Sequence, residues 1–172
     1  MRILVDTSVD SGFGIRASAE SFWAERWLLR SGPIPISAAT VFERCCGFSQ
    51  KLAAEASSNH WGSRLARYRE AIAEGAIYEI VPWDATGALV AGEVLGRRPL
   101  PPPRRRSRRS ERRTDARRSW LIDVLIAAQA AVEERAVLTR NVDDFRAIAT
   151  VLPAPLGLRV LKFPDDVSSM LG

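Results

Sequence analysis

The sequence predicts an α/β fold in which a mostly parallel central sheet is covered by helices on both faces. Short apolar runs rich in β-branched residues alternate along the chain with longer segments of helical spacing, and this alternation is typical of parallel sheets. The chain has 172 residues, of which 47% are hydrophobic and 26% charged, which is typical of one globular domain. We therefore expect residues 1–172 to form a single three-layer domain.

Five short apolar runs are predicted to form the strands of this sheet. The first run is Ile3, Leu4 and Val5, ended by Asp6, and its composition is typical of a buried strand. Most of the later runs lie next to a glycine or proline, which marks the limit of a strand. The predicted strands are residues 2–5, 34–36, 77–81, 136–139 and 158–162.

Six segments between these runs are predicted to be helices. In residues 18–30, Trp23 and Trp27 recur at helical spacing, which indicates a helix with one apolar face. Ser37 and Asn59 precede later segments as candidate N-cap residues. The predicted helices are residues 18–30, 37–57, 59–74, 84–96, 119–134 and 142–149.

Composition excludes several classes of protein. No apolar run approaches the roughly 20 residues that span a bilayer, and the amino terminus lacks a signal-peptide core, so we expect a cytoplasmic protein. The two cysteines, Cys45 and Cys46, are adjacent, and His60 is the single histidine. Such a set excludes a disulfide scaffold and a zinc site of the usual ligand spacing.

A basic insertion at about residues 97–118 dominates the charge distribution. It holds 11 of the 25 basic residues against two acids, a net charge of +9, whereas the remainder of the chain carries −4. Such a segment favours a polyanionic partner, although a solvated, mobile loop is the alternative. It contains no aromatic residue, so contact with RNA would be to phosphates rather than by base stacking. The arginines predicted to contact RNA are Arg104, Arg105, Arg106, Arg108, Arg109, Arg112 and Arg113.

Two aspartates lie in apolar surroundings. Asp123 is the one charged residue in residues 120–128, and a buried carboxylate is costly unless it is paired or bound to a metal. A salt bridge or a place in the first turn of a helix is the alternative. Asp6 follows a predicted buried strand and either belongs to a site at the carboxyl end of the sheet or caps the next element.

Three further polar residues extend this set. Glu43 lies within the predicted helix 37–57 beside small residues, which favours close packing, or else it is an exposed helix residue. Asn141 and Asp144 follow a predicted strand, either to face the strand ends together with Asp6 or to form a capping pair. Carboxylates converge in a low-dielectric site only with a compensating cation. Oxygen ligands select Mg²⁺ or Mn²⁺, and such ions promote phosphodiester cleavage.

Four blocks of sequence follow one another along the chain. They contain an opening strand with its aspartate, a Ser-Thr-Glu-Gly helix, an Asp-x-x-Ile-Ala-Ala helix and a Thr-Arg-Asn-x-x-Asp-Phe turn. The blocks are residues 2–8, 36–47, 123–128 and 139–145. Taken together and in this order, they make the chain similar to the PIN-domain ribonucleases of the VapC (virulence-associated protein C) toxin type. The resemblance implies a PIN-like three-layer fold, and it spans nearly the whole chain.

The resemblance also implies which residues act. Carried over by position, Asp6, Glu43 and Asp123 would be the core ligands of Mg²⁺ or Mn²⁺, and Asp144 the final catalytic aspartate. Asn141 aligns with a metal-site position that is often aspartate in the family, and the missing charge would weaken a second metal.

Three neighbouring residues complete these expectations. Thr7 or Ser8 would orient the metal ligands. Asp143 is an alternative to Asp144 as the residue that faces the site.

The basic insertion departs from the family pattern, because it is longer and more arginine-rich.

A metal-dependent endoribonuclease that is the toxin of a toxin–antitoxin pair is therefore the predicted function. The resemblance implies an RNA substrate, a cognate antitoxin that covers the acidic site, and a homodimer; the basic insertion would then be an RNA-binding arm or a dock for an acidic antitoxin segment. Two alternatives stay open: a non-catalytic nucleic-acid-binding or regulatory PIN module, which the asparagine at 141 favours, and an RNA-processing PIN nuclease without an antitoxin.

Overall fold

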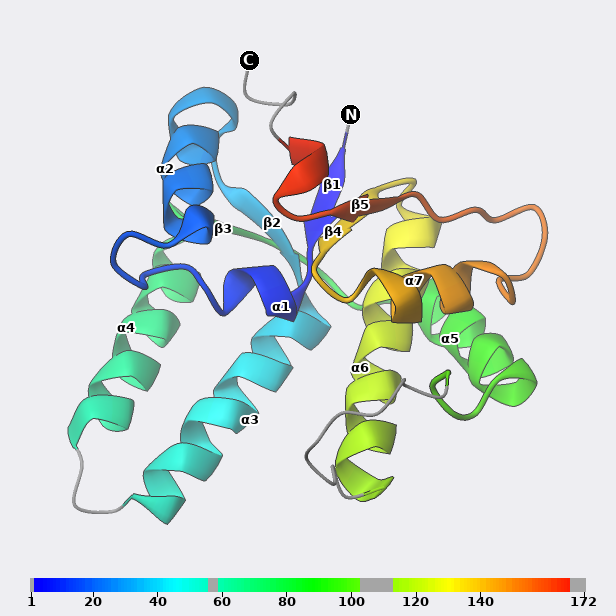
Figure 1. Ribbon diagram of the computed structural model, residues 1–172, viewed down its shortest axis with the longest axis horizontal. Coiled ribbons are helices and arrows are strands. Elements are labelled where there is room, and N and C mark those ends of the chain that lie inside the picture. The colour runs from blue at the N-terminus through cyan, green and yellow to red at the C-terminus, as the bar shows by residue number, and fades with distance from the viewer. Residues whose placement is uncertain (1, 56–58, 103–112, 168–172) are drawn as a thin grey trace.

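A five-stranded, all-parallel sheet forms the centre of the protein (Figure 1). The computed structural model describes residues 2–55, 59–102 and 113–167. Within them the strand order is β3-β2-β1-β4-β5. The strands are β1 (Ile3–Val5), β2 (Ile34–Ser37), β3 (Tyr78–Val81), β4 (Ala136–Thr139) and β5 (Val160–Lys162).

The helices connect these strands in the predicted order. They are α1 (Thr7–Asp10), α2 (Ala19–Ser31), α3 (Ala38–Ala54), α4 (Asn59–Glu74), α5 (Ala85–Arg97), α6 (Arg113–Val132) and α7 (Val142–Ala149), followed by the short 3-10 helix η1 (Asp165–Val167). The prediction missed α1, which is a single turn. It also began α6 too late, at residue 119, because arginine and alanine extend a helix as readily as apolar residues do.

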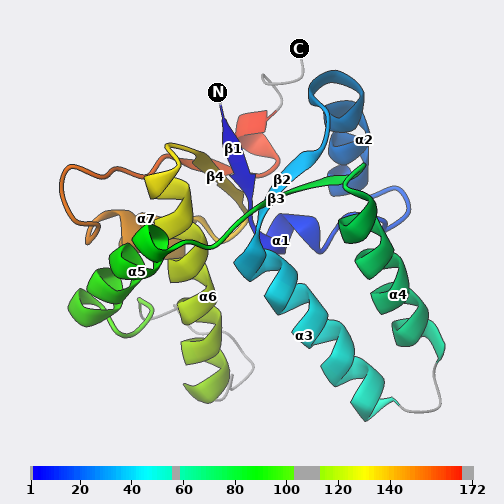
Figure 2. The same ribbon diagram turned by 180° about the vertical axis from the view of Figure 1, so that it is seen from behind.

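Helices cover both faces of the sheet, which confirms the predicted α/β class. Ile3 and Val5 of β1 pack with Trp23 of α2 and Phe48 of α3 on one face. Leu4, between them, points to the opposite face, as expected for a strand. The views of Figures 1 and 2 show α2 and α4 on one side and α5, α6 and α7 on the other.

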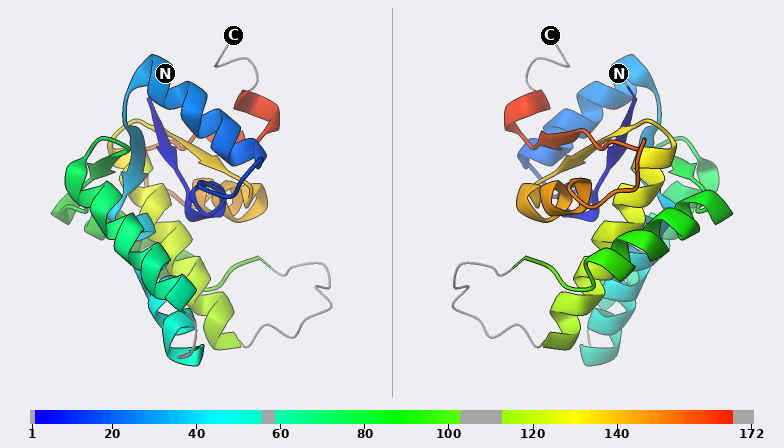
Figure 3. Two further views of the ribbon diagram at one scale, coloured as in Figure 1. Left: turned by 90° about the vertical axis from the view of Figure 1, so that its left-hand side faces the viewer. Right: turned by 90° about the vertical axis from the view of Figure 1, so that its right-hand side faces the viewer.

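Three elements meet at the edge where the parallel strands end. The helix α1 follows β1 directly, α3 follows β2 directly, and Thr139 ends β4 beside β1. Figure 3 shows from two sides that α3, α4 and α6 extend away from the sheet in the same direction. The carboxyl end of the sheet, where ligands bind in folds of this class, is thus bordered by α1, α3 and the end of β4.

No helix in the described ranges is both long and apolar enough to cross a membrane.

Most of the arginines predicted to contact RNA lie outside the described residues. These are Arg104, Arg105, Arg106, Arg108, Arg109 and Arg112. Arg113 is the first residue of α6.

Candidate active site

Asp6 lies at the carboxyl end of β1 and is 2% exposed. Its Oδ2 atom accepts hydrogen bonds from the Ser8 hydroxyl at 2.6 Å, from the Thr139 hydroxyl at 2.8 Å and from the Ser8 backbone N–H at 3.3 Å. The last of these bonds makes Asp6 the N-cap of α1. All three donors therefore bind Oδ2 of the Asp6 carboxylate, and none of them binds Oδ1.

Asp123 and Asp144 form a carboxylate pair beside Asp6. The side-chain amide of Asn141 donates to Asp123 Oδ2 at 2.9 Å and to Asp144 Oδ2 at 2.7 Å. Asp123 is 5% exposed and Asp144 is 2% exposed. Asp143, the alternative to Asp144, is exposed, so the aspartate that faces the site is Asp144.

Thr139 joins the two groups, and the sequence analysis did not single it out. Its hydroxyl donates to Asp6 Oδ2 and accepts from the backbone N–H of Asn141 at 2.8 Å. It comes last in β4, which pairs directly with β1. The sequence offered one indication of this role: Thr139 is a polar residue at the end of a strand, and that strand lies next to β1.

Glu43 projects from α3 toward Asp6 and is half-buried rather than exposed. Burial is the main reason that the pKa of its carboxyl is raised; the Thr7 hydroxyl opposes this shift, and the Asp6 carboxylate adds to it. The Arg118 guanidinium, on α6, also lowers the pKa of Glu43. Ser8 and Thr139 thus present hydroxyl groups to Asp6, and the Thr7 hydroxyl lies near Glu43.

These residues fit a divalent cation by their chemistry. Burial raises the pKa of Asp6, and the hydrogen bonds from Ser8 and Thr139 lower it. Within residues 2–55, 59–102 and 113–167, no three His, Cys, Asp or Glu side chains gather closely enough to hold a metal. The acids form two neighbouring pairs, Asp6–Glu43 and Asp123–Asp144. A cation would offset the repulsion within and between buried carboxylate pairs, and oxygen donors suit Mg²⁺ or Mn²⁺.

Solved structures share this architecture. The sequence matches no protein-family model and none of the curated proteins. In structure it is similar to a chain of VapBC2 from Rickettsia felis bound to a promoter DNA fragment, with a TM-score of 0.60 and 17% identity over 95% of this chain and 99% of that one. DNA-bound VapBC from Salmonella typhimurium gives 0.55 and 23% identity over 94% and 98% of the two chains. A toxin–antitoxin complex from Klebsiella pneumoniae gives 0.54 and 18% over 88% and 96%.

This chain has a PIN-like fold. The matches cover nearly the full length of both partners, and the five-strand parallel order agrees with the architecture that the sequence predicted. The likeness establishes the fold, and the chemistry of the site rests on the residues themselves.

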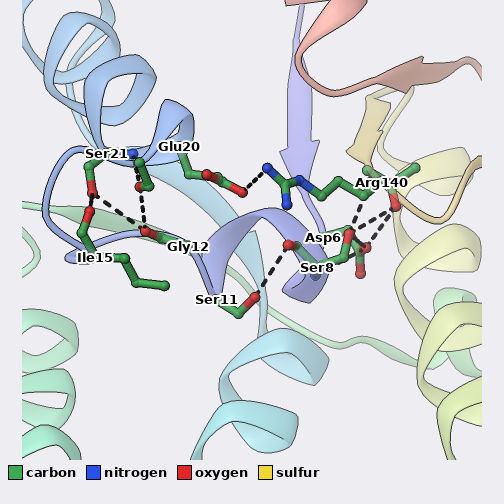
Figure 4. Close-up of polar contacts among 10 residues, drawn as sticks. Asp6, Ser8, Ser11, Gly12, Ile15, Glu20, Ser21 and Arg140 are labelled. Carbon is green, nitrogen blue, oxygen red and sulfur yellow. Dashed lines mark hydrogen bonds and ion pairs between the residues drawn. The ribbon is translucent and has the colours of Figure 1, made fainter.

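An ion pair anchors the turn that carries Thr139 and Asn141 in this PIN-like fold. Arg140 pairs with Glu20 at the start of α2, and its backbone N–H donates to the Ser8 hydroxyl at 3.0 Å. Figure 4 shows the Arg140 side chain reaching across α1 toward Glu20. The Glu20 side chain is 6% exposed, so the pair is shielded from solvent on the glutamate side and links the first turn of α2 to the turn after β4.

Gly12 makes room for Glu20, and we expect Gly12→Ala to destabilise the protein. A Cβ at position 12 would lie 2.4 Å from the Glu20 carboxyl carbon, and such overpacking costs about 1–3 kcal/mol in free energy of unfolding. Urea denaturation measures this loss. Gly92→Ala is the control, because nothing lies within 4 Å of a Cβ there; it should stabilise α5 by about 0.5–1 kcal/mol. Equal stability of the two variants would contradict the close approach.

A pocket of about 370 Å³ lies on the other side of α1 and α3 from the acids, against α2 and α4. Leu28, Phe48 and Ala71 contribute apolar surface, and Arg64 and Arg67 lie on its α4 side. The pocket thus combines apolar surface with charges of both signs, because Glu25 also lines it, and the sequence analysis did not predict it.

Proposed function

We propose that this chain is a metal-dependent endoribonuclease and the toxin of a toxin–antitoxin pair. The observation that carries the proposal is the meeting of two carboxylate pairs at the carboxyl edge of the sheet: Asp6 with half-buried Glu43, and the buried Asp123 with Asp144. Burial of acids costs stability, so the gathering of three buried aspartates and half-buried Glu43 at one edge of the sheet supports a function that needs them together.

The chain's own residues divide the work of phosphodiester hydrolysis. Asp6, Glu43, Asp123 and Asp144 would hold Mg²⁺ or Mn²⁺, which when bound activates water and stabilises the leaving oxygen. Ser8 and Thr139 fix the Asp6 carboxylate by donating to Oδ2, as outer residues do for metal ligands. Hydrolysis adds water to phosphorus and releases a 3′-hydroxyl and a 5′-phosphate.

Arginine residues supply the affinity for RNA in this proposal. Arg118 lies on α6 close enough to Glu43 to lower its pKa, and it is the last residue of the basic insertion at 97–118, which carries a net charge of +9. Neutralisation of phosphates by arginine gives sequence-independent, salt-sensitive binding. The insertion would therefore hold the RNA near the acids.

An antitoxin is the proposed protein partner. The similar structures include a complex described as toxin–antitoxin. The pocket against α2 and α4 suits an apolar segment that carries acidic residues for Arg64 and Arg67.

A cytoplasmic location and a homodimer complete the proposal. Exposed apolar side chains such as Phe42 and Leu89 favour self-association, which light scattering of the purified chain would measure.

The first test is cleavage of a mixed tRNA and rRNA pool by purified protein. Discrete cuts with Mg²⁺ or Mn²⁺, absent with chelator and absent in Asp123→Asn, are the expected result, because Asp123 is a proposed metal ligand. Cuts that persist in the variant or with chelator would contradict the proposal.

A non-catalytic regulatory module is the second candidate, and the Asn141 amide between two acids favours it, since an amide weakens cation binding. Calorimetry with Mn²⁺ separates the two candidates, because the module would release no binding heat. A third, an RNA-processing nuclease without an antitoxin, differs in cells: induced expression of a toxin should arrest growth, and a co-expressed antitoxin should restore it.

A further inference from the structure

Two hydroxyl groups hold the Asp6 carboxylate, and each is itself held by the turn that follows β4. The Ser8 hydroxyl donates to Asp6 Oδ2 at 2.6 Å and accepts from the Arg140 backbone N–H at 3.0 Å. The Thr139 hydroxyl donates to the same oxygen at 2.8 Å and accepts from the Asn141 backbone N–H at 2.8 Å. Two consecutive N–H groups of one turn therefore act on Asp6 through two hydroxyls.

The direction of these hydrogen bonds depends on the turn. A hydroxyl group has one hydrogen and two lone pairs, so a hydroxyl that accepts a backbone N–H keeps its hydrogen for the carboxylate. Ser8 Oγ and Thr139 Oγ1 lie 3.3 Å apart, and without the two N–H groups either hydroxyl could donate to the other. The position of the turn thus decides whether both hydroxyls donate to Asp6.

The side chain of Arg140 ties this turn to α2. Its guanidinium pairs with the Glu20 carboxylate (Figure 4) and lies 5.5 Å from the centroid of the Phe163 ring. The Phe163 backbone N–H donates to the Thr139 carbonyl at 2.9 Å. The turn is therefore held by backbone bonding after β5 on one side and by an ion pair with α2 on the other.

Glu20 is a buried acid that α2 does not need for its own capping. Its side chain is 6% exposed, and the side chain of Ser18 already caps the helix. Gly12 makes room for the glutamate, because a Cβ at that position would clash with the Glu20 side chain. Burial of a carboxylate is unfavourable unless it is paired, so the pair with Arg140 accounts for an acid at this place.

We infer that Glu20 is a positioning residue of the proposed active site. Through Arg140 it fixes the turn after β4, and through the two hydroxyls the turn fixes the Asp6 carboxylate. This inference rests on the proposed function and adds to it a residue of α2 that lies outside the four acids. Loss of the pair should therefore disturb the orientation of Asp6 while leaving every proposed ligand in the chain.

Amide hydrogen exchange of full-length, metal-free Glu20→Gln tests whether the pair holds the turn. Exchange of the Arg140 N–H should become about tenfold faster, because local opening no longer breaks a charge-assisted pair. The Asp6 N–H donates to the Leu138 carbonyl at 3.0 Å, and it should keep its rate if the variant is folded. An unchanged Arg140 rate would overturn the inference, and so would equal acceleration of both amides, which reports a general loss of stability.

Cleavage kinetics test whether the turn acts on the reaction. In Glu20→Gln, kcat should fall by about tenfold, as for other residues that orient a metal ligand, and KM should change little because the basic insertion is intact. Arg140→Gln should have the same effect. The double variant should be no slower than Arg140→Gln alone, since Glu20 acts through Arg140. A further loss in the double variant would show that the two residues act independently and would overturn the inference.

Glu93→Gln is the matched control. It makes the same chemical change and also breaks a pair with an arginine, but Glu93 and Arg97 are both about half exposed and lie on α5. Its kcat and its exchange at Arg140 should equal those of the unmodified protein. Changes as large as those in Glu20→Gln would assign the effect to net charge and overturn the inference.

The remaining outcomes also decide. If Glu20→Gln does not fold, Arg140→Gln takes its place, with exchange measured at the Asn141 N–H. If the unmodified protein cleaves RNA and the folded variant cleaves it equally fast, this inference fails and the proposed nuclease stands. If the unmodified protein cleaves no RNA with Mg²⁺ or Mn²⁺, the proposed function fails, and the positioning role fails with it.

Discussion

Replacing Asp6 with asparagine should abolish RNA cleavage and at the same time stabilise the metal-free protein. The amide oxygen can accept the hydrogen bonds that Ser8 and Thr139 now give to Oδ2. The amide nitrogen removes a buried charge whose pKa is raised by burial and which repels Glu43. Function and stability therefore make opposite demands on this position, as is common at active sites.

Two measurements check Asp6→Asn. The rate of cleavage should fall by about 100-fold or more. Loss of a residue that only orients a metal ligand costs up to about 100-fold, and loss of a ligand itself should cost at least as much. The melting temperature without metal should rise by about 2–4 °C, the equivalent of 1 kcal/mol for a chain of this size. Asp143→Asn makes the same chemical change at an exposed position and should alter neither quantity. Retained cleavage in Asp6→Asn would remove Asp6 from the proposed metal ligands.

Replacing Arg44 with methionine should lower the free energy of unfolding by about 3–5 kcal/mol at neutral pH, because it leaves a buried charge without its partner. Arg44 Nε lies 2.9 Å from Asp10 Oδ2, and the Asp10 side chain is fully buried. The guanidinium also stacks 4.6 Å from the centroid of the Phe48 ring. The double variant Asp10→Asn/Arg44→Met should recover most of the loss, since it removes both charges.

The pH dependence of unfolding identifies Asp10 as the cause. Burial raises the pKa of Asp10 from 3.8 to about 6, although Arg44 and Tyr78 lower it. The folded state therefore keeps a proton that the unfolded state has released, and stability falls as pH rises through this range. Without Arg44 the pKa of Asp10 rises further, so the loss in Arg44→Met should be smaller at pH 5 than at pH 8 in urea denaturation. An equal loss at both pH values would assign the effect to packing.

The sheet was predictable because each strand is marked locally. Ile3, Leu4 and Val5 are apolar on both sides, as a strand covered by helices on two faces must be, and the structure buries all three. The single-turn helix α1 was not predictable, because one turn is too short to show apolar periodicity. The start of α6 was missed for a related reason: its first turns are polar and present no apolar pattern.

The sequence indicated the residues of the candidate site but not the contacts among them. Asp123 stands out because its neighbours are apolar, and the resemblance supplied the rest. The role of Asn141 depends on where α6 places Asp123 relative to the start of α7, which no local pattern encodes. Asn141 followed by Asp144 was equally compatible with a capping pair, and only packing of α6 beside α7 turns the amide toward the acids.

The pairing of β1 with β4 has a consequence for how the protein is made. Thr139 contacts Asp6 across 133 positions of sequence, and the two aspartates joined by Asn141 also come late in the chain. A growing polypeptide on the ribosome therefore carries Asp6 and Glu43 long before it contains the strand that completes their surroundings. The four acids of the proposed site can therefore come together only in one late step of synthesis, when nearly all of the chain exists.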